Sequence, residues 1–299
     1  MKLGPGQRLA VLLTMALGLS ACGEEAKPPA GLCQSMSVGE QRACAVCDEK
    51  LVCWGGKGSA GAGAQPTRRL TAVAVGSATT CALDAEGAQC WPDTANDAAP
   101  RRWPGRWEAL ANFDDRPCLL GAGSVQCEQV QGAAWVLPGL AHPRRIAAGR
   151  GRVCVLDDAG VRCWALGGAH EPLRAPLLAN PIGLAAGSAV SCASDGRAIV
   201  CAEANEGAAP ITLRPSAGGS VRSLAMNPHD DVCALVDGAL QCWDRGGQPK
   251  PGAPDWRDLK QVAVGDAQVC ALSAEGRVRC AAFGTDASPR RSSGQAGSR

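Results

Sequence analysis

The spacing of the cysteines is the feature that most constrains this chain of 299 residues. Six cysteine pairs have members nine positions apart, and the members of a seventh pair lie ten apart. The pairs are Cys44 and Cys53, Cys81 and Cys90, Cys118 and Cys127, Cys154 and Cys163, Cys192 and Cys201, Cys233 and Cys242, and Cys270 and Cys280. Their first members follow one another at intervals of 37, 37, 36, 38, 41 and 37 residues. This period is typical of a supersecondary unit that stacks against the next, so the sequence predicts seven copies of one unit.

Other positions repeat in phase with the cysteines. In five copies a glycine stands five residues before the first cysteine and follows a short apolar stretch, which predicts a tightly packed inner strand. These glycines are Gly39, Gly76, Gly149, Gly187 and Gly265. Between the two cysteines of a pair lies a turn, and Gly87, Gly160 and Gly276 fit a hairpin that needs a residue tolerant of positive φ. Each copy is therefore predicted to contain a β-hairpin.

The hairpin predicts how the cysteines pair. Residues nine apart in a hairpin with so short a loop face one another across the ladder, close enough for a disulfide. Each bridge would join adjacent strands of one unit and contribute roughly 2–3 kcal/mol. Cys33 and Cys47 remain, and a bond between them would fasten the N-terminal segment to the first unit. The alternative is a redox or zinc site of Cys44 and Cys47 with Cys33 and Cys53, but the phase shared with six other copies favours the disulfides.

The N-terminus has the features of an export signal. Lys2 and Arg8 flank an apolar run from Leu9 to Leu19, which is too short for a membrane-spanning helix. The run ends in Leu19-Ser20-Ala21-Cys22, which resembles the lipobox of bacterial lipoproteins. We therefore expect residues 1–21 to be a cleaved signal peptide, Cys22 to carry the lipid, including palmitate, and residues 22–32 to form a linker. The alternative is an ordinary signal peptide with an incidental cysteine. By resemblance to the sorting rule of bacteria with two membranes, Gly23 after Cys22 favours the outer membrane.

The net charge and the predicted export of the chain limit the kinds of molecule that it can bind. Residues 1–21 hold two of the 30 Lys and Arg residues and none of the 28 Asp and Glu residues, so the mature chain would be neutral. Nucleic acid is therefore not an expected partner, because phosphate binding relies on excess positive charge. Outside the cytoplasm thiols tend to be paired, and the 17 cysteines without the lipidated one leave an even number.

A family resemblance follows from the tryptophans. Four second cysteines precede a tryptophan: Trp54, Trp91, Trp164 and Trp243. The recurring pattern, as in VGSATTCALDAEGAQCW, AGRGRVCVLDDAGVRCW and VGDAQVCALSAEGRVRC, resembles a cysteine-rich form of the regulator of chromosome condensation repeat. The resemblance covers roughly Leu32 to Gly284 and implies an all-β, seven-bladed β-propeller with a disulfide in each blade. Glu128, Ala202 and Ala281 replace the tryptophan, and Phe113 and Pro228 replace the glycine, so we expect irregular blades there, above all the third.

A closed ring protects sheet edges, whereas an open array of hairpins would need capping units. We expect residues 33–286 to form the propeller, with seven four-stranded blades. Either the segment before Met36 or the one after Gly284 could complete the last blade. Residues 287–299 are polar and rich in serine, which predicts a disordered tail.

Three segments are candidate functional sites. The first combines cations with aromatic rings between the second and third copies, and its candidate binding residues are Arg101, Arg102, Trp103, Arg106 and Trp107. Its alternative interpretation is blade packing with arginines on a solvated strand. The longest insertion, around Glu203 to Ser220, is the second. His229-Asp230-Asp231 is the third; it is one of three places with a histidine, beside His142 and His170, and a solvated loop is the simpler interpretation.

The sequence thus predicts a lipid-anchored propeller, monomeric and without cofactor or metal, that binds a protein or surface glycan. Members of the family that it resembles mostly act as interaction platforms. We expect no catalytic residue. The alternatives are a periplasmic lyase or hydrolase, which would gather histidines and carboxylates on one face, and a purely structural envelope protein.

Overall fold

The computed structural model describes residues 28–40, 42–55, 69–92, 100–129, 132–165, 173, 175–204, 208–216, 218–250 and 254–283. These residues form 24 β-strands. Within these ranges no helix is long and apolar enough to cross a membrane. The predicted signal peptide, Cys22 and the predicted tail lie outside the described residues.

The strands form seven antiparallel sheets, and each sheet is built from consecutive strands of the chain. Blade 1 contains β1 (Cys33–Val38), β2 (Arg42–Cys47) and β3 (Lys50–Gly55); blade 2 contains β4 (Ala72–Val75), β5 (Thr79–Leu83), β6 (Gly87–Pro92) and β7 (Arg101–Pro104); blade 3 contains β8 (Ala109–Phe113), β9 (Arg116–Gly121), β10 (Ser124–Glu128) and β11 (Ala134–Val136). Blade 4 contains β12 (Arg145–Gly149), β13 (Arg152–Asp157) and β14 (Gly160–Ala165); blade 5 contains β15 (Gly183–Ala186), β16 (Val190–Ser194), β17 (Ile199–Glu203) and β18 (Ile211–Leu213). Blade 6 contains β19 (Val221–Met226), β20 (Val232–Val236) and β21 (Ala239–Trp243); blade 7 contains β22 (Leu259–Val264), β23 (Gln268–Ser273) and β24 (Val278–Ala282).

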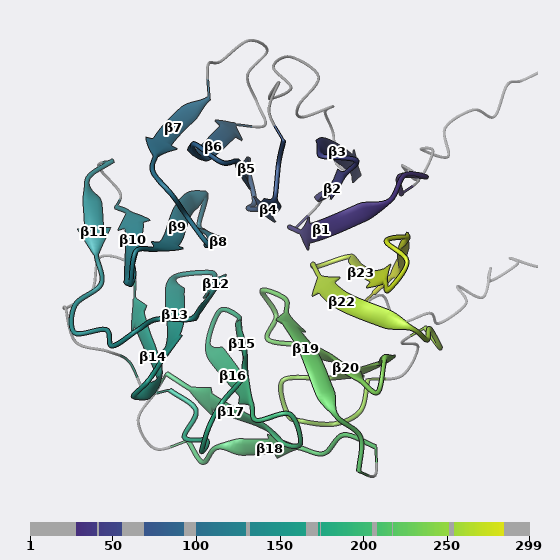
Figure 1. Ribbon diagram of the computed structural model, residues 1–299. Helices are drawn as coiled ribbons and strands as arrows, with labels where there is room; N and C mark the ends of the chain where they lie inside the picture. Colours follow the sequence, from purple (N-terminus) through teal and green to yellow (C-terminus); the bar gives the residue numbers. More distant parts are fainter. Residues whose placement is uncertain are drawn as a thin grey trace, which may run out of the picture.

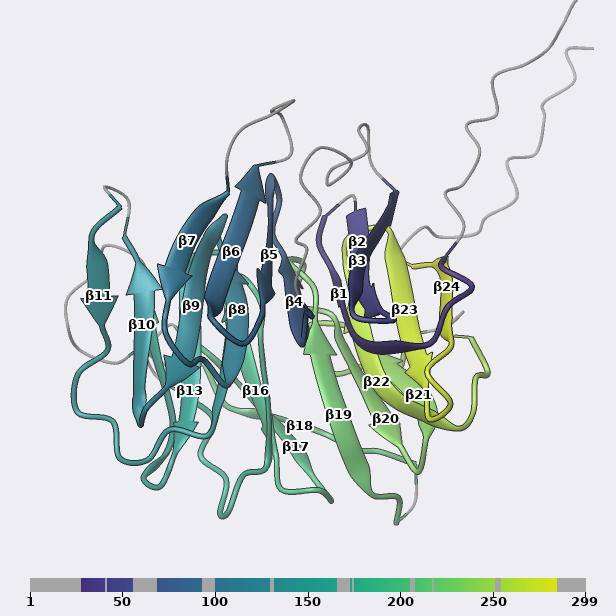
Figure 2. The same cartoon turned by 45° about the horizontal axis from the view of Figure 1, so that its top comes forward.

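The seven sheets are arranged in a ring, like the blades of a propeller (Figures 1 and 2). A central channel is lined by residues of all seven innermost strands. The first strand of every blade is innermost, and each innermost strand contacts the next around the ring, including β22 with β1. The predicted all-β, seven-bladed propeller is therefore confirmed. Three blades have the expected four strands, whereas the described parts of blades 1, 4, 6 and 7 have three. Isolated bridges, Cys163 with Leu173 and Trp243 with Pro249, extend the outer edges of blades 4 and 6.

Disulfides lie within the blades. In all seven blades the two repeat cysteines are directly opposite on the second and third strands, with Cα atoms 4.0–4.1 Å apart. The eighth bond, Cys33–Cys47, joins β1 to β2. All sixteen cysteines are therefore paired as predicted, and the alternative four-thiolate site at Cys44 and Cys47 is wrong. Disulfides in such number are typical of an oxidising compartment outside the cytoplasm.

The apolar core is divided among the junctions between blades. Buried apolar side chains of the described ranges form seven clusters, one at each junction. Where the repeat has tryptophan, its ring is buried against the preceding blade, as Trp164 is against the cluster of blade 3. The junctions that blades 3 and 5 form with their preceding blades have no such tryptophan, and their clusters have the fewest buried members. Large aromatic rings therefore fill most, but not all, of the junctions.

The repeat glycine permits close approach between neighbouring blades. A Cβ atom on Gly149 would lie 2.1 Å from the carbonyl oxygen of Gly187, and one on Gly265 would lie 2.2 Å from that of Gly39. Both distances are too short for any side chain. Glycine therefore recurs here because the innermost strands converge on the channel.

In the described part of the chain, the ring closes between blade 7 and blade 1. Cys33 donates its N–H to the carbonyl of Gly276 at 2.7 Å, and the side-chain amide of Gln261 donates to the carbonyl of Met36 at 2.9 Å. A cluster of buried side chains from blades 1 and 7 covers the same junction. The segment before Met36 does not complete blade 7, because β1 is instead the innermost strand of blade 1. The segment after Gly284 lies outside the described residues.

Blades 3 and 6 replace the repeat glycine but keep a regular inner ladder at that end. β8 pairs with β9 without a register shift, so the expected irregularity of the third blade is not observed. Both blades carry the pattern Asn-x-x-Asp, at Asn112 to Asp115 and at Asn227 to Asp230. Asp115 accepts the N–H groups of Ala78 and Thr79, and Asp230 accepts those of Ala189 and Val190. In these two blades, a carboxylate that accepts hydrogen bonds from the loop of the preceding blade replaces the close packing of the repeat glycine.

Candidate functional site at the channel mouth

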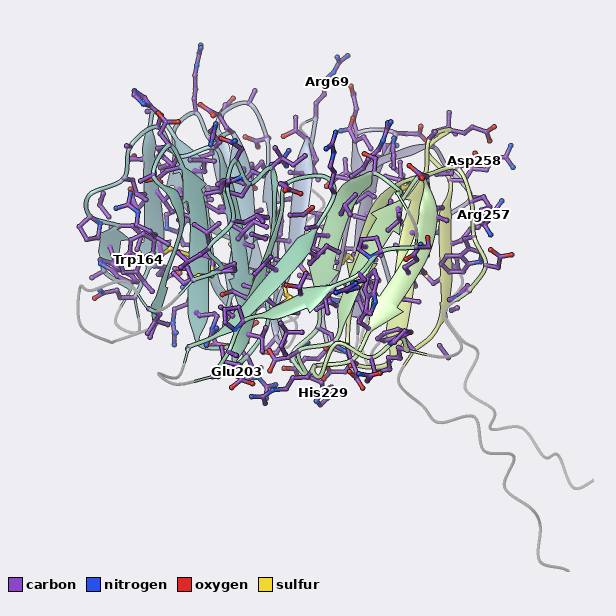
Figure 3. The ribbon with its side chains drawn as sticks, turned by 90° about the horizontal axis from the view of Figure 1, so that it is seen from below. Arg69, Trp164, Glu203, His229, Arg257 and Asp258 are labelled. Carbon is purple, nitrogen blue, oxygen red and sulfur yellow. A yellow bond between two sulfur atoms is a disulfide. The ribbon has the colours of Figure 1, made fainter. Side chains whose placement is uncertain are left out.

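The ring has two faces. The glycine face carries the loops between the innermost and second strands, of which the structure describes residues 39–40, 76–78, 114–115, 150–151, 187–189, 227–231 and 265–267. The hairpin face carries the turns between the second and third strands, residues 48–49, 84–86, 122–123, 158–159, 195–198, 237–238 and 274–277. Figure 3 shows Glu203 and His229 on the glycine face and Arg69, Arg257 and Asp258 on the opposite side. The channel opens on the glycine face into a cavity of about 280 Å³.

One repeat position provides the side chains around this opening. It is the position four residues before the first cysteine of each blade, directly after the repeat glycine where that glycine is present. Its members, which we call the mouth ring, are Glu40, Ser77, Asp114, Arg150, Ser188, His229 and Asp266. Three are carboxylates and one is an arginine, so the mouth ring carries more negative than positive charge. Four members, Glu40, Ser77, Asp114 and Arg150, line the cavity itself.

An ion pair crosses the mouth. The guanidinium of Arg150 in blade 4 contacts the carboxylate of Glu40 in blade 1, and these blades are not neighbours. Glu40 raises the pKa of Arg150 through this hydrogen bond and its charge, and Asp266 and Asp114 add smaller effects in the same direction. Arg150 therefore lies within the field of carboxylates from three other blades. Aliphatic side chains, among them Val38, Val75 and Val264, line part of the cavity wall together with polar groups.

The other carboxylates near the mouth differ in the hydrogen bonds that they accept. Asp114 accepts the N–H of Gly151 in blade 4 at 2.9 Å, whereas Ser77 donates its hydroxyl to Asp115 at 2.5 Å. Oδ1 of Asp266 is buried without a hydrogen-bond partner, and His229 Nε2 lies 3.7 Å away. Burial raises the pKa of Asp266, and Glu40 adds to this; His229 and Arg150 act in the opposite direction. Asp266 is thus a carboxyl group with unused hydrogen-bonding capacity near the mouth.

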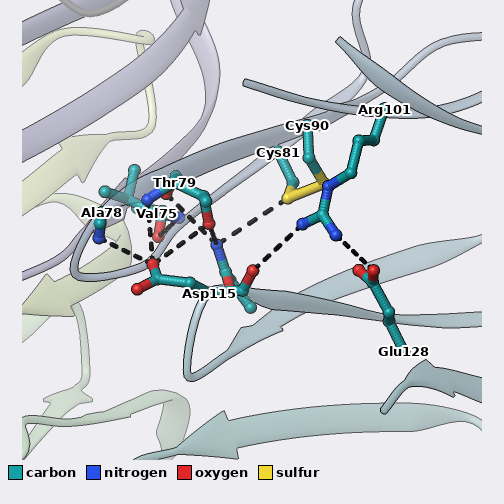
Figure 4. The surroundings of a disulfide bond; sticks show 10 residues. Val75, Ala78, Thr79, Cys81, Cys90, Arg101, Asp115 and Glu128 are labelled. Carbon is teal, nitrogen blue, oxygen red and sulfur yellow. Dashed lines mark hydrogen bonds and ion pairs between the residues drawn. A yellow bond between two sulfur atoms is a disulfide. The ribbon is translucent and has the colours of Figure 1, made fainter. Parts of the chain in front are cut away.

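The predicted binding segment between blades 2 and 3 is partly structural. Arg101 on β7 forms an ion pair with Glu128 of blade 3, the residue that replaces the repeat tryptophan, and its other guanidinium nitrogen reaches the carbonyl of Asp115 (Figure 4). The Glu128 side chain is only 7% exposed. Arg101 also lies over the Trp103 ring, 5.4 Å from its centroid. Arg101 therefore compensates a buried charge, which explains its place in the sequence without a ligand.

The two tryptophans of that segment pack at the same junction. Trp103 and Trp107 are half-buried against the cluster between blades 2 and 3, and Trp107 Nε1 donates to the carbonyl of Trp103 at 3.2 Å. Arg102 and Arg106 are exposed. Arg102 and Trp103 help to line a small hollow of about 120 Å³ beside the β5–β6 hairpin. The aromatic half of this candidate site thus belongs to the core, while a binding role for its two exposed arginines stays a prediction.

The histidines do not converge. His142 lies in the loop that enters blade 4 on the hairpin side and contacts Asp158 at 2.7 Å, whereas His229 lies on the glycine face. His170 and parts of the insertion around Glu203 to Ser220 lie outside the described residues. Glu203 itself pairs with Arg245 at 2.7 Å. The described residues contain no cluster of three His, Cys, Asp or Glu side chains able to hold a metal ion.

Sequence reasoning identified His229 as a candidate but missed Glu40, Asp114, Arg150 and Asp266. The sequence does contain a pattern that identifies them, because each lies four residues before the first cysteine of its repeat. Comparison of the seven copies at that phase, rather than a search for clustered charges along the chain, would have found them.

Comparisons with known proteins show the fold. No protein-family model matches the sequence, and no curated protein matches it either. Among solved structures, Prp20p of Saccharomyces cerevisiae, studied for its binding to Gsp1p and histones, is 19% identical with a TM-score of 0.57, covering 72% of each chain. Human WBSCR16 is 15% identical with a TM-score of 0.64, covering 82% of this chain and 88% of its own. The CRINKLY WD40 ectodomain of the Arabidopsis thaliana receptor kinase ACR4 is 17% identical with a TM-score of 0.62, covering 85% and 96%.

Proposed function

We propose that this chain is an exported, lipid-anchored binding platform that docks a protein partner on its glycine face. The observation that carries the proposal is the mouth ring. The positions around it, cysteine, glycine and tryptophan, recur from blade to blade and hold the fold, whereas the mouth ring differs in chemistry from blade to blade. A rigid scaffold that presents varied side chains around one opening is suited to recognition.

The structural neighbours support this choice over catalysis. The yeast propeller Prp20p is described by its binding to Gsp1p and histones, and Kap60 has been solved bound to the same protein. A lyase or hydrolase site would gather histidines and carboxylates on one face. The two described histidines of this chain lie on different faces, which favours binding over catalysis. Replacement of His142 by alanine should leave ligand capture unchanged if the platform proposal holds, because His142 lies on the hairpin side, away from the mouth ring.

Export and anchoring are the cellular part of the proposal. Lipid attached to Cys22 would hold the ring at the envelope, in the outer membrane where the organism has one. Cys22→Ser should abolish the incorporation of labelled palmitate and release the chain from the membrane fraction. Continued labelling of the Cys22→Ser chain would contradict lipidation at this residue.

The docking face can be tested by capture with matched variants. The intact lipoprotein is isolated from membranes by affinity capture, together with Asp114→Arg on the glycine face and Glu275→Arg on the hairpin face. Both residues are exposed acids, so the two variants change charge equally. A partner that is retained by Glu275→Arg and lost by Asp114→Arg supports the proposal. Capture of no saturable partner would favour a structural envelope protein, and capture of a glycan would replace the protein partner.

A further inference from the structure

The mouth ring resembles a cation site that is filled by the protein itself. Its three carboxylates, Glu40, Asp114 and Asp266, come from blades 1, 3 and 7, and the one guanidinium among them belongs to Arg150. The two neighbouring carboxylates that serve the fold, Asp115 and Asp230, have their oxygens engaged by backbone N–H groups. In the mouth ring, Asp114 accepts a backbone N–H from Gly151, Glu40 faces Arg150, and Oδ1 of Asp266 has no hydrogen-bond partner. Glu40 and Asp266 are therefore the carboxylates most available to a cation.

Arg150 is a replaceable occupant. Its side chain is 58% exposed and that of Glu40 is 28% exposed. Ion pairs between such solvent-exposed groups contribute little to stability, because water and salt screen them and two long side chains must be ordered. Arg150 reaches across the opening from blade 4 to the carboxylate of Glu40 in blade 1. An incoming cation faces only a weak competitor.

The wall of the cavity combines aliphatic side chains with polar groups. Its aliphatic part, which can contact a methylene stem, comes from Val38, Val75, Ala148, Ala186, Met226 and Val264. Lysine and arginine bury their methylene stems along apolar surfaces while the charged end stays with polar partners. A volume of about 280 Å³ is at the lower limit for ligand pockets and admits one long side chain rather than a folded segment.

We propose that the channel mouth binds a lysine or arginine side chain of the partner protein, which displaces Arg150 from Glu40. This inference rests on the proposed function and names the chemistry of its partner. Charge selects the cation, since Glu40, Asp114 and Asp266 outnumber Arg150. The aliphatic side chains in the wall, Val38, Val75 and Val264 among them, can contact the methylene stem of such a side chain, which a small inorganic cation lacks.

The probe is n-butylguanidinium, titrated into the full chain in detergent and followed by NMR or calorimetry; n-butylurea, which is neutral and of similar shape, is the control ligand. Removal of the competitor in Arg150→Ala should tighten binding about two- to fivefold, the range expected for loss of a surface ion pair. Addition of Glu40→Gln to that variant should weaken binding by about fivefold or more. Arg69→Ala, which removes an arginine from the exposed Arg69–Glu49 pair of the hairpin face, should change nothing.

Two results would overturn the inference: equal binding of n-butylurea and n-butylguanidinium, or no change in affinity with Arg150→Ala. The test needs no partner, so it separates this inference from the proposed function. If the probe binds as expected and membrane capture finds no partner, the cation site stands and the platform proposal fails. If capture succeeds and the probe does not bind, the partner docks without this site.

Discussion

Asp115 in blade 3 accepts the backbone N–H of Thr79 in blade 2 at 2.9 Å, and the same carboxylate oxygen accepts the N–H of Ala78 at 2.7 Å. Asp230 repeats this arrangement three blades later, with Val190 at 3.1 Å. Both aspartates lie in blades that lack the repeat glycine. At both departures from the repeat, a side chain therefore ties one blade to the loop of the blade before it.

Asp115→Ala should lower the free energy of unfolding by about 1–3 kcal/mol, because it leaves backbone N–H groups without their acceptor. Asp115→Asn, which keeps one acceptor oxygen, should cost less. Urea unfolding under non-reducing conditions measures both. Asp114→Ala is the control, since Asp114 is exposed and accepts a single N–H from Gly151; an equal loss in Asp114→Ala and Asp115→Ala would refute the special role of Asp115.

Gly149→Ala should destabilise the ring by about 1–3 kcal/mol or more, because the added Cβ would lie 2.1 Å from the Gly187 carbonyl oxygen and the backbone must move. Gly246→Ala serves as the control, since its nearest neighbour, Asp244 Oδ1, would be 3.4 Å away. That change should stay within about 0.5 kcal/mol. Thermal unfolding of the two variants checks the difference; equal melting temperatures would show that the close approach costs nothing.

The disulfide of blade 2 should contribute about 2–3 kcal/mol through its effect on the unfolded chain. The double variant Cys81→Ala with Cys90→Ala should show this loss in urea unfolding. A peptide map without reducing agent comes first, because linkage of Cys81 to any cysteine other than Cys90 would contradict the register of β5 and β6. The same map separates Cys33–Cys47 from Cys44–Cys53, whose members lie close together in sequence.

Asp266 predicts a pH dependence of stability. Burial raises its pKa in the folded protein above the ordinary value of 3.8. Between 3.8 and the raised pKa the folded state binds more protons than the unfolded state, so this residue makes the protein more stable as the pH falls through that window. Asp266→Asn removes the charge and should be more stable than the native protein at neutral pH.

Thermal unfolding across that pH range compares the two proteins. The advantage of Asp266→Asn should shrink as the pH falls and reach a constant value once Asp266 is protonated in both states. An advantage that stays the same from neutral to acid pH would show that the charge of Asp266 is not desolvated.

The regular part of the fold was predictable from local spacing. The nine-residue interval places Cys81 opposite Cys90 because a hairpin with a fixed short loop has one register. The mouth ring was harder to predict, since Glu40 and Arg150 are 110 positions apart and meet only when the ring is closed. The Arg101–Glu128 pair was missed for a related reason. A glutamate in the place of a tryptophan indicates a change in the core, but not which cation from the neighbouring blade approaches it.

The junction between blades 7 and 1 has one further consequence. It is held by the same kinds of contact as the other six, and the described strands of each blade come from one continuous stretch of chain. The position of the two ends is therefore not fixed by the architecture. A circular permutant that joins the native termini with a linker and opens the chain between two other blades should assemble the same ring, with all eight cystines still formed inside single blades.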